Sequence, residues 1–416
     1  MAKPLINIST TQAIFFACFL VAYEFLTYIA NDMIMPAMVL VVATFNGPET
    51  AVATSLTAYM LGGASLQIFL GPISDCYGRR PIMLAGAILF FFCTVLIGCS
   101  NSIDQFLVAR FLQGMGLCFI WVVGYATLQE IFTEMDAIRL IALMANVAII
   151  APLIGPLLGA LFIMYFSWRL IFFTIAALTS VTIWGLWRFM PESVGQIKSD
   201  GGQIKRMPIS LMHVLRSYLC LMRNKSFILG SMALGIAGLP CIIWIALAPV
   251  IIINAAQLSK LQYALWQIPA FTASIMGNIA LRWLTYKDST TQIVYKGSIL
   301  LIISLITMYV LPILISDDFI WLMPGLIVYF FAASIISAPL TRIILFSTGV
   351  SKGTAAALLS IIVIITEACG IEIVNYLYIN HDNTIFGLCC ALAGIIYLIL
   401  LMALNTSLRF AKISDN

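Results

Sequence analysis

The sequence predicts an all-α membrane protein with twelve transmembrane helices in two six-helix bundles. Three observations lead to this prediction: the composition, the spacing of apolar segments, and the distribution of Lys and Arg. Of the 416 residues, 62% are hydrophobic and 9% are charged, whereas a soluble domain is about 25% charged. The mean hydropathy of +1.07 agrees with this. We therefore expect most of the chain to lie in the membrane.

A transmembrane helix needs about 20 mostly apolar residues, and short polar turns separate twelve such segments. The predicted spans are 12–43, 51–73, 81–100, 105–130, 139–165, 169–190, 225–255, 262–284, 293–315, 320–347, 353–380 and 385–404. The longest polar interruption divides them into six and six. We expect an N-terminal bundle over 1–190, a cytoplasmic linker over 191–224 and a C-terminal bundle over 225–416.

Lys and Arg indicate the orientation of these spans. If the N-terminus is cytoplasmic, only Arg169 and Lys260 fall in outer turns, and Arg110 falls within the fourth span. All other Lys and Arg residues then fall on the inner side, as the positive-inside rule requires. We therefore expect both termini to be cytoplasmic.

Two carboxylates, Glu24 and Asp32, lie inside the first span. An acidic residue at the centre of a membrane helix costs roughly 2.5–3.5 kcal/mol, so such residues generally mark ion or substrate pathways. Tyr28 and Asn31 follow Glu24 by four and seven residues and share its helical face. This polar stripe predicts a cavity that handles protons or cations.

Arg110 lies in the fourth span, and the rise of 1.5 Å per residue places it at the depth of Asp32. We expect each to neutralise the other. The alternative is a salt bridge that only orders the two helices. Gln113 and Tyr125 of the same span are candidates for the cavity wall, and a hydrogen bond to a neighbouring helix is the alternative for each. Glu367, in the eleventh span, is a candidate further proton site; a polar contact to a neighbouring helix is the alternative.

Three local motifs occur together in the first half. The loop after the second span contains Gly71, Asp75, Gly78, Arg79 and Arg80, in which glycine permits a tight turn and the arginines favour the cytoplasmic side. The fourth span reads RFLQGMG from its arginine onward. The fifth reads APLIGPLLG, with small residues four apart that permit close helix contact and prolines that favour a bend; its motif positions are Pro152, Gly155, Pro156 and Gly159.

These motifs resemble the inner-loop, arginine and antiporter motifs of the major facilitator superfamily. Asp32 followed by Pro36 also resembles a signature of its twelve-span drug/proton antiporter branch. The resemblance implies the major facilitator fold and a proton-coupled antiporter that exports lipophilic cationic and neutral drugs across the bacterial inner membrane by alternating access. It implies that Glu24 and Asp32 are the proton and substrate acids and that Arg110 supports them.

The same resemblance implies a monomer that uses the proton gradient without a cofactor and contacts membrane lipids, small lipophilic substrates and protons, but no nucleic acid. Two positions depart from the family pattern. Cys76 stands where a basic residue is usual in the inner-loop motif, and Glu367 stands where an apolar residue is expected.

Other functions remain as alternatives. The first is an exporter dedicated to one metabolite or siderophore on the same scaffold, and the second is a membrane receptor or passive channel, against which the acids of the first span argue. An enzyme is not expected, because the sequence shows no nucleotide-binding glycine loop, no metal-ligand spacing and no catalytic triad. His213 and His381 are isolated.

Overall fold

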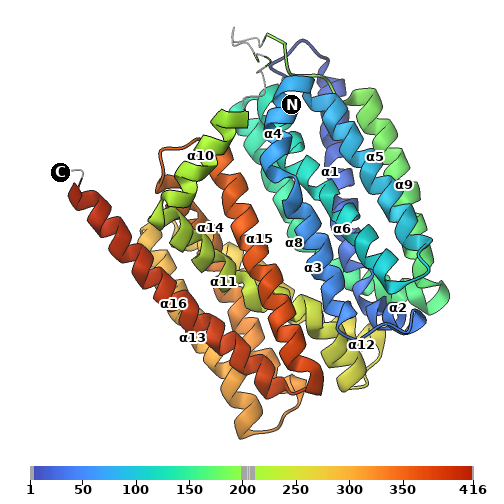
Figure 1. Ribbon diagram of the computed structural model, residues 1–416, viewed down its shortest axis with the longest axis vertical. Helices are drawn as coiled ribbons and strands as arrows, with labels where there is room; N and C mark the ends of the chain where they lie inside the picture. Colours follow the sequence, from blue (N-terminus) through green and yellow to red (C-terminus); the bar gives the residue numbers. More distant parts are fainter. Residues whose placement is uncertain (1–3, 198–203, 205, 207–210, 415–416) are drawn as a thin grey trace. The chain divides into compact units, whose positions relative to one another are not determined.

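The computed structural model describes residues 4–197, 204, 206 and 211–414, and the secondary-structure elements of these residues are all helical (Figure 1). Eleven helices in this part of the chain are long and apolar enough to cross a membrane. A bent pair, Ala51–Ser65 and Gln67–Tyr77, makes twelve if it is one span. The predicted all-α membrane fold is therefore confirmed. Parts of the expected linker 191–224 and the extreme termini lie outside the described residues.

Contacts divide the chain into two compact units, of which the first comprises Met1–Gly47 and Ala58–Leu211 and the second Pro48–Thr57 and Met212–Asn416. The helices up to residue 189 are α1 (Thr10–Asp32), η1 (Met35–Ala37), α2 (Met38–Thr44), α3 (Ala51–Ser65), α4 (Gln67–Tyr77), α5 (Arg79–Gly98), α6 (Ile103–Phe119), η2 (Ile120–Gly124), α7 (Tyr125–Ile131), α8 (Glu134–Tyr165) and α9 (Trp168–Phe189).

In the first unit, α1 packs against α8 and α9, while α5 packs against α6 and α9 (Figure 1). Small residues allow α3 and α6 to approach closely. A Cβ atom added at Gly62 or Gly114 would collide with the backbone of the opposite helix, at Phe111 and Tyr59 respectively. Membrane helices use glycine in this way because lipid provides no hydrophobic force between them. This contact brings Tyr59 to the buried face of α6.

Glycine also ends the second predicted span. Gly78 separates α4 from α5 with φ of +110°, a conformation that residues with a Cβ rarely adopt. The span itself bends by 41° between α3 and α4. Ser9 and Ser102 cap α1 and α6 by accepting hydrogen bonds from the backbone N–H groups of Gln12 and Gln105. These turns and caps fix where the helices that carry the acidic and basic side chains begin.

The helices from residue 211 onward are α10 (Leu211–Arg223), α11 (Lys225–Ala248), η3 (Pro249–Ala255), α12 (Lys260–Leu284), α13 (Thr290–Leu314), η4 (Phe319–Leu322), α14 (Met323–Phe346), α15 (Lys352–Leu377), η5 (Tyr378–Asn380) and α16 (Asn383–Ser414). In the second unit, α11 packs against α14, α15 and α16, and α14 packs against α12 and α13. Capping boxes begin α12 at Ser259 and α13 at Ser289.

Candidate functional site

The polar stripe of α1 is buried within the first unit. Glu24 is completely buried, and Asn31 and Asp32 are 8% and 5% exposed. The α-helix ends at Asp32, and the chain continues through the short 3-10 helix η1, which contains Pro36. Proline lacks an N–H group and cannot continue the hydrogen-bond ladder. Asp32 therefore lies at the point where the regular helix stops.

Arg110 is completely buried on α6 and makes three hydrogen bonds. Its guanidinium donates to the side-chain oxygen of Asn31, to Gln113 Oε1 at 2.8 Å and to the carbonyl oxygen of Ala30 at 3.4 Å. It also lies over the ring of Tyr59, with Cζ 4.5 Å from the ring centroid, an arrangement that favours a cation electrostatically. Neutral oxygens and an aromatic face thus hold this cation.

The expected direct pair between Asp32 and Arg110 is absent: of the ion pairs among the described residues, none joins these two side chains. Asn31 lies between them. It accepts from Arg110 and donates through Nδ2 to Asp32 Oδ1 at 3.1 Å. Successive helix residues point about 100° apart, so Asn31 rather than Asp32 faces the guanidinium.

Both acids of α1 retain an oxygen without a partner. Glu24 Oε1 accepts a hydrogen bond from the Tyr125 hydroxyl at 3.0 Å, but Glu24 Oε2 and Asp32 Oδ2 are buried and have no hydrogen-bond partner in the described part of the chain. Buried polar groups are normally satisfied, so each such exception requires an explanation. A proton on each carboxylate would remove its charge, and a bound cation would also give its free oxygen a partner.

The four predicted cavity residues occupy different positions. Tyr28 and Tyr125 are half-buried, whereas Asn31 and Gln113 are buried and hydrogen-bonded to Arg110. Gln113 also donates to the hydroxyl of Thr94 at 2.9 Å. We therefore assign Gln113 to the support of Arg110 rather than to a cavity wall.

A π-helical segment, η2, precedes Tyr125. Such segments are rare and often occur at functional sites, because the wider turn redirects the side chains that follow it. Here the regular helix resumes at Tyr125, whose hydroxyl contacts Glu24. The local change of helix type therefore accompanies the contact between α1 and α7.

The small residues of the fifth span lie against Asp32. An added Cβ at Gly155 would be 2.6 Å from Asp32 Cβ, and one at Gly159 would collide with the carbonyl oxygen of Met33. Both glycines are therefore required for α8 to pack at its present distance from the end of α1. Pro152 and Pro156 lie inside α8, which remains one helix from Glu134 to Tyr165.

At the loop after α4, a network of charges links four segments of the first unit. Arg79 Nη2 pairs with Asp75 Oδ1 at 2.6 Å and with Glu130 Oε1 at 2.8 Å. Glu192 accepts from the backbone N–H groups of Arg79 and Arg80 at 2.9 and 3.2 Å. A carboxylate at these first N–H groups of α5 is favoured by the helix dipole.

The sequence motif predicted part of this network. Asp75 and Arg79 interact within it, whereas Gly71 has open space beside it, because an added Cβ would meet only Val122 at 3.9 Å. An added Cβ at Gly78 would collide with the carboxylate of Glu192. Gly78 thus gives both the turn and the room for this acid.

Sequence reasoning missed Tyr59, Glu130 and Glu192. Glu130 is the last residue of the segment GYATLQE, and Glu192 follows the proline that ends the sixth span. An acidic residue beside a loop rich in arginine was the available signal for both. Tyr59 gave no such signal, because an aromatic residue in a membrane helix generally packs in the core or at the interface.

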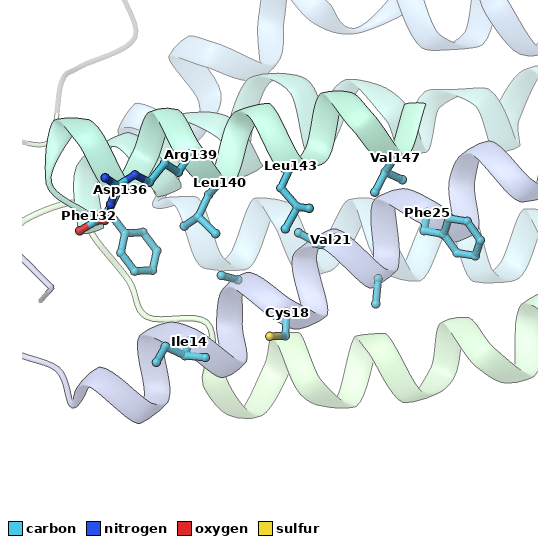
Figure 2. A pocket seen from close by; sticks show the side chains of 12 residues that line it. Ile14, Cys18, Val21, Phe25, Phe132, Asp136, Arg139, Leu140, Leu143 and Val147 are labelled. Carbon is cyan, nitrogen blue, oxygen red and sulfur yellow. Dashed lines mark hydrogen bonds and ion pairs between the residues drawn. The ribbon is translucent and has the colours of Figure 1, made fainter. Parts of the chain in front are cut away.

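An apolar cavity of about 610 Å³ lies between α1 and α8 (Figure 2). Phe132, Asp136 and Arg139 line one end, and Phe25 and Val147 line the other. The Arg139 guanidinium pairs with the Asp136 carboxylate at 3.2 Å. This volume is in the usual range of sites for small molecules.

Glu367 lies on α15 of the second unit and is 8% exposed. No described residue forms a hydrogen bond or an ion pair with its side chain. Among the described residues, no group of three or more His, Cys, Asp and Glu side chains is arranged to hold a metal ion.

Comparisons with known proteins agree with these features. Residues 20–366 match the family model described as Major Facilitator Superfamily. The chain is 42% identical over 391 residues to the multidrug transporter MdfA of Yersinia pestis bv. Antiqua (strain Angola), with 94% of each chain covered. It is 41% identical to MdfA of Escherichia coli O157:H7, over 94% of this chain and 93% of that protein.

Solved structures share the fold at low sequence identity. The D-xylose-proton symporter superimposes with a TM-score of 0.71 at 13% identity, over 92% of this chain and 97% of the symporter. A bacterial homologue of the human lysosomal transporter Spinster gives a TM-score of 0.70 at 13% identity, over 97% of this chain and 98% of the homologue. At such identities the likeness concerns the fold alone.

Proposed function

The chain belongs to the Major Facilitator Superfamily, and we propose that it exports lipophilic cationic and neutral drugs across the bacterial inner membrane in exchange for protons. The resemblance found in the sequence is thereby confirmed. The observation that carries the proposal is the pair of buried carboxylates on α1, each of which has one oxygen without a partner. The family is one of transporters rather than enzymes, and the chain is a multi-pass membrane protein.

In this proposal, protons and substrate compete for Glu24 and Asp32. A proton neutralises a carboxylate and releases a bound cation, and the arrival of a cation displaces the proton. Arg110 remains charged behind Asn31, so that it stabilises the negative charge of Asp32 without occupying its second oxygen. A direct salt bridge would instead compete with both ligands for this carboxylate.

The cavity between α1 and α8 supports a role for the apolar part of the substrate. Its side chains are mostly apolar, and it borders α1, the helix that carries Glu24 and Asp32, although neither acid lines it. A lipophilic body in this cavity would lose water-exposed surface, at roughly 25 cal/mol per Å² buried. Because apolar contacts are not directional, the cavity would bind compounds of different shapes, which agrees with the export of diverse compounds.

The remaining assignments complete the proposal. The two bundles and the linker 191–224 form an alternating-access carrier with cytoplasmic termini, and it acts as a monomer in contact with membrane lipids. The proton gradient is its energy source, with no cofactor. The network of Asp75 and Arg79 acts in gating. The glycines of α8 transmit movement to Asp32, and Glu367 is a further proton site.

Proton release from purified protein tests the exchange directly. The addition of tetraphenylphosphonium to unbuffered wild-type protein should release protons, whereas Glu24→Gln and Asp32→Asn should each abolish the release. Asp104→Asn is the matched control, because Asp104 is an exposed carboxylate in the first turn of α6. Release that is unchanged in both acid variants would refute their roles.

A susceptibility panel of unrelated toxic compounds separates a multidrug exporter from a dedicated one, since only the former gives resistance to several.

A further inference from the structure

Glu367 is a buried carboxylate of the second unit. It is not part of the exchange site, by which we mean Glu24 and Asp32 of the first unit. It lies on α15 in the interior of a transmembrane helix and has no partner among the described residues. An unpaired carboxylate at such a position costs roughly 2.5–3.5 kcal/mol if it remains charged. A ligand that supplies positive charge would remove this cost.

The neighbouring helix leaves room for this side chain. An added Cβ at Gly238 of α11 would be 2.6 Å from Glu367 Oε1, so the carboxylate occupies the space that a side chain would fill. Two further glycines hold α11 and α15 close together at this level: an added Cβ at Gly235 would be 3.0 Å from Thr366 Cβ, and one at Gly370 would collide with Leu239. Packing therefore fixes the position of Glu367.

A structural role in repairing the helix kink does not explain Glu367. Pro240 interrupts α11, but the hydroxyl of Tyr329 bridges the opened turn. This hydroxyl accepts from the backbone N–H of Cys241 at 3.2 Å and donates to the carbonyl oxygen of Ala237 at 2.6 Å. An inserted side chain of this kind is a known cause of helix bending. The carboxylate takes no part in it.

The surface beside Glu367 is apolar and partly open. Leu234, Gly238, Cys241 and Ile245 of α11 are half-buried, and their spacing of four, three and four residues places them on one helix face. A carboxylate next to such a face matches a ligand with one positive charge on an apolar body.

We propose that Glu367, beside Gly238 of α11, forms a second binding site for lipophilic organic cations, located within the second unit and separate from Glu24 and Asp32. The inference rests on the proposed function, since it assumes that such cations are substrates. It adds a site that recognises charge at a position where the family pattern has an apolar residue.

Binding of radiolabelled tetraphenylphosphonium to the purified full-length protein tests this site. Glu367→Gln should reduce the number of cations bound per protein from two to one, whereas Asp318→Asn, which removes an exposed carboxylate of the same unit, should leave it as in the wild type. Gly238→Ala should weaken binding in the same direction, because the added methyl group occupies the position of the carboxylate. Triphenylphosphine oxide, which carries three phenyl rings on phosphorus but no net charge, should bind all four proteins equally.

The double variant Glu24→Gln/Asp32→Asn separates this site from the exchange site. It should retain tetraphenylphosphonium binding, and the addition of Glu367→Gln should remove it. The inference is overturned if Glu367→Gln binds the cation as the wild type does, if it loses the uncharged compound equally, or if the double variant binds no cation. The proposed exchange is judged separately by proton release, so failure of one leaves the other measurable.

Discussion

Asn31→Leu tests the chain of hydrogen bonds that joins Arg110 to Asp32. Asn31 accepts from the guanidinium and donates to the carboxylate. Leucine has a similar volume but can do neither. Each bond to a charged group contributes about 1.5–3 kcal/mol, so the substitution should destabilise the protein by about 3–6 kcal/mol. Arg110 keeps Gln113 and the carbonyl of Ala30 as partners, which favours the lower end.

Thermal unfolding in detergent measures this loss. A change of 1 kcal/mol shifts the midpoint by about 2–4 °C for a domain of 150–250 residues, so Asn31→Leu should lower it by at least about 6 °C. Asn146→Leu is the matched control. Asn146 is exposed on α8 and forms no hydrogen bond with the described residues. Its variant should unfold within about 2 °C of the wild type.

A double-mutant cycle with Asp32→Asn then isolates the coupling. If Asn31 acts through Asp32, the effect of Asn31→Leu should be smaller in the Asp32→Asn background by about 0.5–3 kcal/mol. The reasoning is refuted if Asn31→Leu is no more destabilising than Asn146→Leu, or if the two substitutions are strictly additive.

Two further substitutions test the packing around this site. Gly155→Ala should destabilise the protein by about 1–3 kcal/mol through overpacking, because the added Cβ would be 2.6 Å from Asp32 Cβ. It should therefore lower the unfolding midpoint and reduce substrate-induced proton release. Gly71→Ala, whose added Cβ would meet only Val122 at 3.9 Å, should change neither, and equal effects of the two substitutions would contradict the packing argument. Glu192→Gln should destabilise by about 0.3–1 kcal/mol through loss of charge at the first turn of α5, and a deficit in unfolding midpoint that persisted undiminished in high salt would argue against this electrostatic origin.

The membrane fold was predictable because its signal is spread over many residues. Each span needs only length and apolar composition, and single polar residues such as Glu24 do not interrupt it. The bend between α3 and α4 was not predicted. It occurs at Leu66, between Ser65 and Gln67. The side chains of these two residues donate to the carbonyl oxygens of Gly62 and Gly63 at 2.7 and 3.0 Å, and side chains that insert into a helix in this way favour a kink.

The sequence predicted which residues form the candidate site, but it did not predict which of them form hydrogen bonds with one another. Depth along a helix follows from the rise per residue, and it placed Arg110 level with Asp32. The direction of each side chain depends on the rotation of α1 against α6, which follows from tertiary packing and not from the position of a residue along its own helix. A turn of one residue was enough to place Asn31 rather than Asp32 at the guanidinium.

The charge balance of the first unit connects these observations with exchange. Its buried charged groups are Glu24, Asp32, Arg110 and Arg79, and Arg79 is neutralised by Asp75 and Glu130. The other three leave one net negative charge when all are ionised. In a medium of low dielectric constant this excess is costly, so the resting site requires one added positive charge.

The need for an added positive charge explains why Asn31 lies between Arg110 and Asp32. A directly paired Asp32 would be satisfied by Arg110 alone, and Glu24 would be the only acid available to a ligand. With the amide inserted, both acids keep an oxygen free while the guanidinium still lowers the cost of their charge. In the proposed mechanism, one proton or one cation at a time restores neutrality, and this one-for-one replacement is the exchange that an antiporter performs.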